Sequence, residues 1–112
     1  MKQLPKDIEV EIEFLRSEHG GRKTVAYSGY RPQFFYNGQD WDAVHDYIGT
    51  ETVEPGQRVK AYLAFMSPQE HEGNIYPSMP FLVREGNRVV GFGSVSKIIE
   101  LPKSASRMRE NT

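Results

Sequence analysis

Residues 84–98 read REGNRVVGFGSVSKI and residues 20–34 read GGRKTVAYSGYRPQF, and these two stretches decide the fold. Each has the composition of a β-hairpin fragment, because strand-forming valine and aromatic residues stand beside glycines that favour turns. Gly91 and Gly93 lie inside the long strand-like run of residues 84–98. A glycine in such a place indicates a bulge or the close approach of another backbone.

Outward from these stretches, the alternation of apolar and charged residues marks further strands. The alternation is clearest over residues 8–14 and 59–65, where a period of two indicates strands with one face in water. Asn37 and Gly38 form a strong hairpin-turn signal. The predicted strands cover residues 8–14, 23–28, 33–36, 59–65, 81–83 and 89–99.

Residues 40–50 fit two structures. Trp41, Val44, Tyr47 and Ile48 have helical spacing, and the last three also suit an irregular strand. No other segment has a convincing helical pattern. Six or so short strands therefore predict an all-β barrel or sandwich.

Length and composition predict one soluble domain. The chain has 112 residues, of which 38% are hydrophobic and 26% charged, and this balance is typical of a globular protein. No apolar run approaches the roughly 20 residues that span a bilayer, and no secretory signal is visible, so we expect a cytoplasmic protein without a membrane partner. We expect one β-barrel domain over residues 1–100 and a flexible C-terminal tail over 101–112, because that tail lacks periodicity.

The residue types needed for catalysis or cofactor binding are not arranged in any known motif. Cysteine is absent, and His19, His45 and His71 share no metal-binding spacing, so each is predicted to be a surface or turn histidine. No nucleophile elbow and no Walker sequence occurs. We therefore predict neither an enzyme nor a bound cofactor.

Charge is unevenly distributed along the chain, although the formal net charge is only −1. Arg16, Arg22, Lys23 and Arg31 form a basic segment with a single acid, whereas residues 39–54 contain five acids and no Lys or Arg. A phosphate-binding surface needs basic residues, which the first segment supplies, whereas the acidic residues of the second segment would repel phosphate.

The two stretches together carry a family resemblance. Gly-Tyr-Arg-Pro-Gln-Phe at 29–34, then Pro55 and Gly56, then Arg-Glu-Gly-x-Arg-x-Val-Gly-x-Gly at 84–93 resemble the third, C-terminal domain of elongation factor Tu over residues 7–99. The resemblance implies a six-stranded antiparallel β-barrel that is not catalytic. Because the chain starts at Met1, just before this domain, we expect a free-standing module with no GTPase and no nucleotide.

The resemblance also implies candidate contacts. Arg22, Gln33 and Gly86 match positions that touch the T-stem of aminoacyl-tRNA in the family, and Lys23 replaces a histidine there. With Arg31, these residues form the predicted contact set for RNA or a partner protein. Each also has a structural interpretation, in which the arginines form ion pairs between strands and Gly86 serves the hairpin.

Other positions depart from the family pattern. Asn37 and Ser67 stand where the family has cations, and Asp42 adds an anion, so that phosphate binding should be weaker. The loop over residues 69–80 is also longer than the family's.

Two hypotheses remain open. The first is a module that binds a protein partner, by mimicry of elongation factor Tu or by self-association, with the aromatic residues between 27 and 47 supplying the interface. The alternative is a tRNA-binding or other RNA-binding module that uses the basic face around Arg22 and Gln33. An enzyme is the least favoured class.

Overall fold

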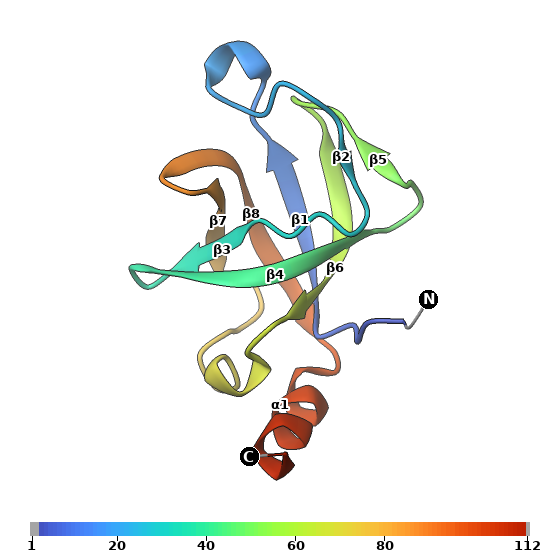
Figure 1. Ribbon diagram of the computed structural model, residues 1–112, viewed down its shortest axis with the longest axis vertical. Coiled ribbons are helices and arrows are strands. Elements are labelled where there is room, and N and C mark those ends of the chain that lie inside the picture. Colours follow the sequence, from blue (N-terminus) through green and yellow to red (C-terminus); the bar gives the residue numbers. More distant parts are fainter. Residues whose placement is uncertain (1–2, 112) are drawn as a thin grey trace.

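The computed structural model describes residues 3–111 and shows a closed barrel of six antiparallel strands with a helix below one end (Figure 1). Neighbouring strands follow the order β1-β6-β4-β3-β7-β8, and β8 pairs with β1 to close the ring. The barrel strands are β1 (Ile8–Phe14), β3 (Gln33–Tyr36), β4 (Gln39–Tyr47), β6 (Arg58–Phe65), β7 (Pro80–Glu85) and β8 (Arg88–Ile98). The predicted six-stranded antiparallel barrel is confirmed.

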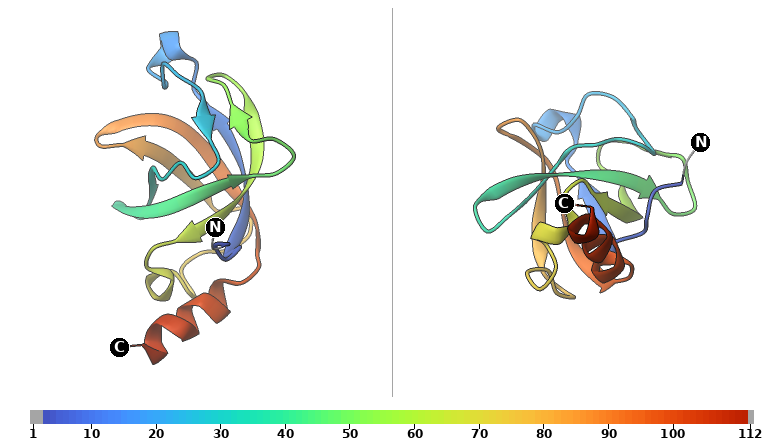
Figure 2. Two further views of the ribbon diagram at one scale, coloured as in Figure 1. Left: turned by 45° about the vertical axis from the view of Figure 1, so that its right-hand side comes forward. Right: turned by 60° about the horizontal axis from the view of Figure 1, so that its bottom comes forward.

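The remaining elements are short. A separate two-stranded sheet pairs β2 (Ala26–Tyr27) with β5 (Thr52–Val53) beside the barrel. The 3-10 helices η1 (Ser17–His19) and η2 (Pro68–Glu70) lie at opposite ends of the barrel, and α1 (Leu101–Glu110) follows β8 (Figures 1 and 2). Within residues 3–111, no helix is long and apolar enough to cross a membrane.

Three segments differ from the sequence-based expectation. The strand predicted over residues 23–28 is reduced to β2, which pairs with β5 outside the barrel. The ambiguous segment 40–50 is mostly the strand β4, which pairs with both β3 and β6. The segment 101–112, expected to be a flexible tail, instead contains the ten-residue helix α1, with Thr112 outside the described residues.

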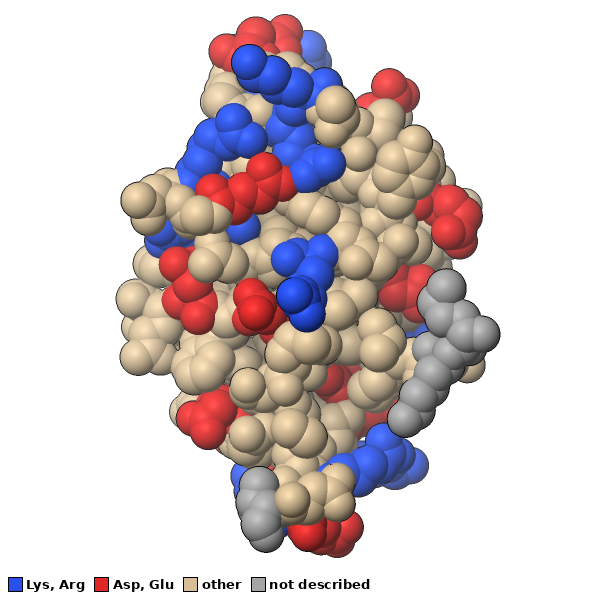
Figure 3. Space-filling view, in the orientation of Figure 1, with Lys and Arg blue, Asp and Glu red and all other residues tan. Residues whose placement is uncertain are grey.

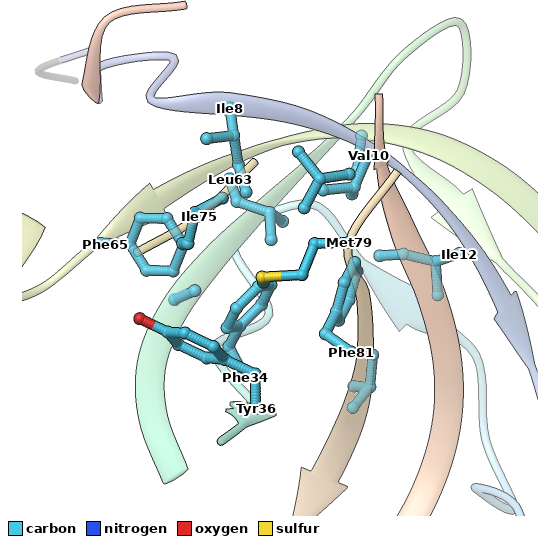
Figure 4. Close-up of a cluster of buried hydrophobic side chains, with 14 of the residues drawn as sticks. Ile8, Val10, Ile12, Phe34, Tyr36, Leu63, Phe65, Ile75, Met79 and Phe81 are labelled. Carbon is cyan, nitrogen blue, oxygen red and sulfur yellow. The ribbon is translucent and has the colours of Figure 1, made fainter. Parts of the chain in front are cut away.

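The core fills the interior of the barrel with side chains from every strand (Figure 4). The alternation in β1 places Ile8, Val10 and Ile12 inside, where each is at most 1% exposed. On β3 and β7, Phe34 and Phe81 stack with ring centroids 4.4 Å apart. Burial of such side chains stabilises the fold by about 1.5–3 kcal/mol each.

Gly93 allows the barrel to close. A Cβ atom at this position would lie 2.3 Å from the backbone oxygen of Glu11 on β1 and 2.8 Å from the ring of Phe81 on β7. The predicted close backbone approach is confirmed, and it explains why a strand-breaking residue stands in the middle of β8.

Helix α1 is attached to the barrel through Asp7, whose side chain is fully buried. One carboxylate oxygen accepts a hydrogen bond from the backbone N–H of Phe65 at 2.9 Å, and the other accepts from the Ser104 hydroxyl at 2.5 Å. Burial raises the pKa of Asp7, although these two hydrogen bonds oppose the shift. Leu101 and Ala105 are buried on the same side of the helix, so that α1 packs as part of the folded domain.

Replacement of Ser104 by alanine should lower the free energy of unfolding by about 2 kcal/mol, because a buried carboxylate loses one of its two side-chain hydrogen bonds. Ser106 is exposed on the same helix, so Ser106→Ala is the matched control and should change stability by at most about 0.5 kcal/mol. Urea denaturation followed by circular dichroism measures both changes. Equal effects of the two substitutions would show that Asp7 does not hold the helix.

Candidate interaction surface

The two stretches that decide the fold meet at Glu85. Arg22 and Tyr30, from the first hairpin region, both donate hydrogen bonds to the same carboxylate oxygen of Glu85 at the end of β7. Arg88 donates to the other oxygen at 3.1 Å. The guanidinium of Arg22 also lies over the Tyr30 ring, 4.4 Å from its centroid. These four residues are called the Glu85 cluster below.

Within the Glu85 cluster, the Glu85 carboxyl group stays ionised and the Tyr30 hydroxyl stays protonated. Burial alone would raise the pKa of Glu85, but the hydrogen bonds from Tyr30 and Arg22 hold it below its usual value. Burial raises the pKa of Tyr30, so its hydroxyl keeps the proton that it donates. The cluster is therefore an ionised carboxylate enclosed by donors, and such charge-assisted hydrogen bonds are among the stronger ones in proteins.

Arg22 has little capacity left for an external ligand. Its second guanidinium nitrogen, Nη2, lies 3.3 Å from both the Thr24 hydroxyl and the Val25 carbonyl oxygen, and its side chain is 19% exposed. The guanidinium is thus mainly occupied by contacts within the domain. Arg22 thus forms an ion pair within the domain, as the structural interpretation has it, but from the loop before β2 rather than from a strand.

The other predicted contact residues are spread over the same end of the barrel and beyond. Gln33 on β3 is in register with Arg84 on β7, and its amide oxygen is buried. Gly86 occupies the β7–β8 turn, next to Glu85, with a φ of 62° that favours glycine. Lys23 and Arg31 are both exposed. Arg31 lies next to Met66, with its Nη1 3.8 Å from the Met66 sulfur.

The prediction that all three histidines are surface or turn residues is wrong for His45, which is buried on β4, whereas His71 does lie in a turn but is also buried. His45 and His71 are 3% and 0% exposed, and only His19 lies on the surface. The Nδ1 atom of His45 is 3.1 Å from the Tyr47 hydroxyl, and that of His71 is 2.7 Å from the Tyr36 hydroxyl. Burial lowers the pKa of His45 to about 3 and that of His71 to about 4, so both are neutral near pH 7.

Tyr30, Glu85 and Arg88 are the residues that sequence reasoning missed. All three lie within the two stretches, which is the signal that could have found them. Contact between side chains of the two stretches would explain why both motifs occur in the same sequence. Within residues 3–111, no group of three His, Asp or Glu side chains is arranged to hold a metal ion.

Replacement of Glu85 by glutamine should lower the free energy of unfolding by about 2 kcal/mol, because Arg22 and Tyr30 lose a charged acceptor. Glu51 is exposed and is not a member of the Glu85 cluster, so Glu51→Gln is the control that changes net charge equally. The two urea midpoints are the measurement. A control loss as large as that of Glu85→Gln would indicate a general charge effect.

Charged and apolar surfaces are separated on the barrel. Lys and Arg side chains gather near η1 and the β7–β8 turn, with acidic side chains among them (Figure 3). On the outer face of β3, β7 and β8, by contrast, a shallow groove of about 510 Å³ has an almost wholly apolar lining. This surface, called the Phe92 strip below, consists of the exposed Pro80 and Phe92 and the half-buried Phe35 and Leu82.

Phe92 is the most prominent member of the Phe92 strip, with 44% of its surface exposed. On the β1 side it borders a second groove, where Glu13 pairs with Arg58 at 2.9 Å. The strip is thus an apolar surface next to an ion pair.

The fold agrees with a comparison of the sequence with known families. The profile of the family described as Elongation factor Tu C-terminal domain matches residues 3–99, which include all six barrel strands. The match ends before α1 begins at Leu101. This chain belongs to the elongation factor Tu C-terminal domain family.

Proposed function

We propose that this domain is a non-catalytic, translation-related module that binds a protein partner through the Phe92 strip. Family membership supports the link to translation and a cytoplasmic location, because the family's domain is a non-catalytic β-barrel of a translation factor. The observation that carries the proposal is the exposure of Phe92 beside Leu82 and Phe35 on one outer face. Exposed apolar surface of this kind, bordered by charges, is typical of protein interfaces.

The state of Arg22 supports the same choice. A phosphate-binding arginine needs free donors, whereas this guanidinium already donates to Glu85 and is mostly covered. The partner that suits the Phe92 strip is a protein with an apolar surface, since the strip itself offers no charge.

Photo-crosslinking from position 92 tests the proposal. A benzoylphenylalanine in place of Phe92 should capture one defined protein, and Phe92→Ser should abolish co-purification of that protein with the domain. Ile99, 39% exposed, gives the control, because Ile99→Ser removes a similar apolar side chain away from the strip. Equal loss of the partner in both variants, or capture of many proteins without preference, would contradict the proposal.

A second candidate, RNA binding, is favoured by the exposed cations near η1. Lys23 and Arg16 line a common groove, and Arg88 lies in the Glu85 cluster. If this surface binds the tRNA backbone, affinity should fall steeply between 50 and 200 mM salt, and Lys23→Gln should reduce the salt dependence by about one phosphate contact. A tRNA titration at these two salt concentrations decides the matter, because absence of a salt effect would reject this candidate.

A further inference from the structure

A polar cleft lies at the end of the barrel opposite the Glu85 cluster. It has a volume of about 350 Å³ and separates the tip of the β3–β4 hairpin from η2. It is called the Trp41 cleft below. Its lining residues are Tyr36, Asn37, Gln39, Trp41, Glu70 and Asn74.

Both walls of the Trp41 cleft are held in place by local structure. On the hairpin side, Asn37 and Gly38 both have positive φ, of 50° and 74°, as a tight two-residue turn requires. On the other side, the amide of Asn74 donates to the Glu70 carbonyl oxygen at 3.0 Å, and its backbone N–H donates to the His71 carbonyl oxygen at 2.9 Å. The lining groups are therefore presented by rigid turns.

Behind the cleft, the buried ring of His71 supports its aromatic wall. The ring meets Trp41 edge-to-face, with centroids 4.7 Å apart, and its Nδ1 lies 2.7 Å from the Tyr36 hydroxyl. An uncharged His71 does not repel a cation in the cleft. Burial lowers its pKa to about 4, so it stays uncharged near neutral pH.

The lining groups favour a positively charged ligand. Glu70 supplies a carboxylate, the side-chain amides of Asn37 and Gln39 supply acceptor oxygens, and the lining contains no Lys or Arg. Among the residues that the structure describes, Glu70 forms no ion pair, whereas Asp40 nearby on β4 is paired with Arg84 at 3.6 Å. Tryptophan is the aromatic side chain that attracts cations most strongly, and Tyr36 lies on the same side of the hairpin.

We propose that the Trp41 cleft binds a basic side chain, lysine or arginine, of the partner protein. The proposal rests on the proposed function, since it supposes that the partner is a protein. It adds a charged anchor to the apolar contact of the Phe92 strip. Together they predict a partner surface with an apolar area and a protruding basic residue.

Tryptophan fluorescence gives a direct test, because Trp41 is the only tryptophan of the chain. Titration with the peptide acetyl-Gly-Arg-Gly-amide, or with its lysine counterpart, should change the emission in a saturable way, with a dissociation constant of about 1 mM. Glu70→Gln should weaken binding about fivefold or more, and added salt should weaken it as well. Glu51→Gln, which removes an exposed carboxylate elsewhere, should leave binding unchanged.

The inference would be overturned by no saturable change with either basic peptide, by an equal response to acetyl-Gly-Glu-Gly-amide, or by no effect of Glu70→Gln. Saturable binding of a neutral sugar with similar affinity would also overturn it, because the amides and Trp41 would then act without charge. Phe92→Ser should not affect peptide binding. The peptide titration therefore tests the cleft alone, whereas partner capture from position 92 tests the proposed function.

Discussion

Gly93→Ala should lower the free energy of unfolding by about 3 kcal/mol, although it adds a single methyl group. The added Cβ would lie 2.3 Å from the backbone oxygen of Glu11 and 2.8 Å from the Phe81 ring. Both neighbours belong to strands that pair directly with β8, so neither can move without disturbing the barrel closure. The substitution must therefore shift backbone, and this is more costly than the displacement of a flexible side chain.

Urea denaturation measures this effect, and a loss of about 3 kcal/mol should lower the midpoint by about 1.5 M. Gly49→Ala is the matched control, because Gly49 has a φ of 82° but no atom within 4 Å of its added Cβ. That control should lose about 1 kcal/mol from backbone strain alone. If both variants lost the same free energy, the close approach of β1 and β8 would not limit position 93.

The sequence indicated the type of contact at Gly93, but not which residues form it. A glycine inside a strand indicates a bulge or a close approach, and at Gly93 the structure shows a close approach. That the approaching backbone is Glu11 depends on the register of β8 with β1, where Ile12 lies opposite Gly93. Register between strands far apart in sequence is set by the whole barrel, so a local pattern does not contain it.

Helix α1 was missed for a different reason. Its buried side comprises Leu101, Ser104 and Ala105, of which Leu101 is the one large apolar residue. A hydrophobic pattern with so few members falls below what periodicity can detect. The contact that holds the helix is a polar one, from Ser104 to Asp7, across 97 positions of sequence.

The candidate site was predicted only in part, because charge alone does not show which cations are free. Arg22 and Lys23 are adjacent and equally basic in sequence, yet Arg22 donates to Glu85 while Lys23 is exposed. The burial of His45 and His71 was likewise hidden, since an isolated histidine carries no sign of which face it occupies. The aromatic groups that enclose them come from β1, β3, β4 and β6.

These buried histidines lead to the second large expected effect: acidification should unfold the domain well above the pH at which most carboxylates are protonated. The pKa is about 3 for His45 and about 4 for His71 in the folded protein, against 6.5 for an ordinary histidine. Below pH 6.5 the unfolded chain therefore binds two protons that the folded state does not bind. Stability should fall with a limiting slope of about 2.7 kcal/mol per pH unit.

The sign follows from the direction of the shifts. A histidine whose folded-state pKa is lowered contributes its full stability above pH 6.5, and this contribution is lost as the pH falls towards 4. The lowered pKa of Glu85 acts in the same direction at still lower pH. The raised pKa of Asp7 acts in the opposite direction, because the folded state then binds its proton first. Two histidines outweigh one opposing carboxyl group, so the net loss on acidification remains.

Urea midpoints between pH 7 and pH 4.5 measure the slope, and the slope gives the number of protons taken up on unfolding. His71→Gln should reduce that number by about one, even if it also lowers stability at pH 7. An unchanged slope in His71→Gln would show that His71 binds its proton equally well in the folded and the unfolded chain. In that case its ring would gain a charge behind the Trp41 cleft below about pH 6.5, and a cation should bind the cleft less well there.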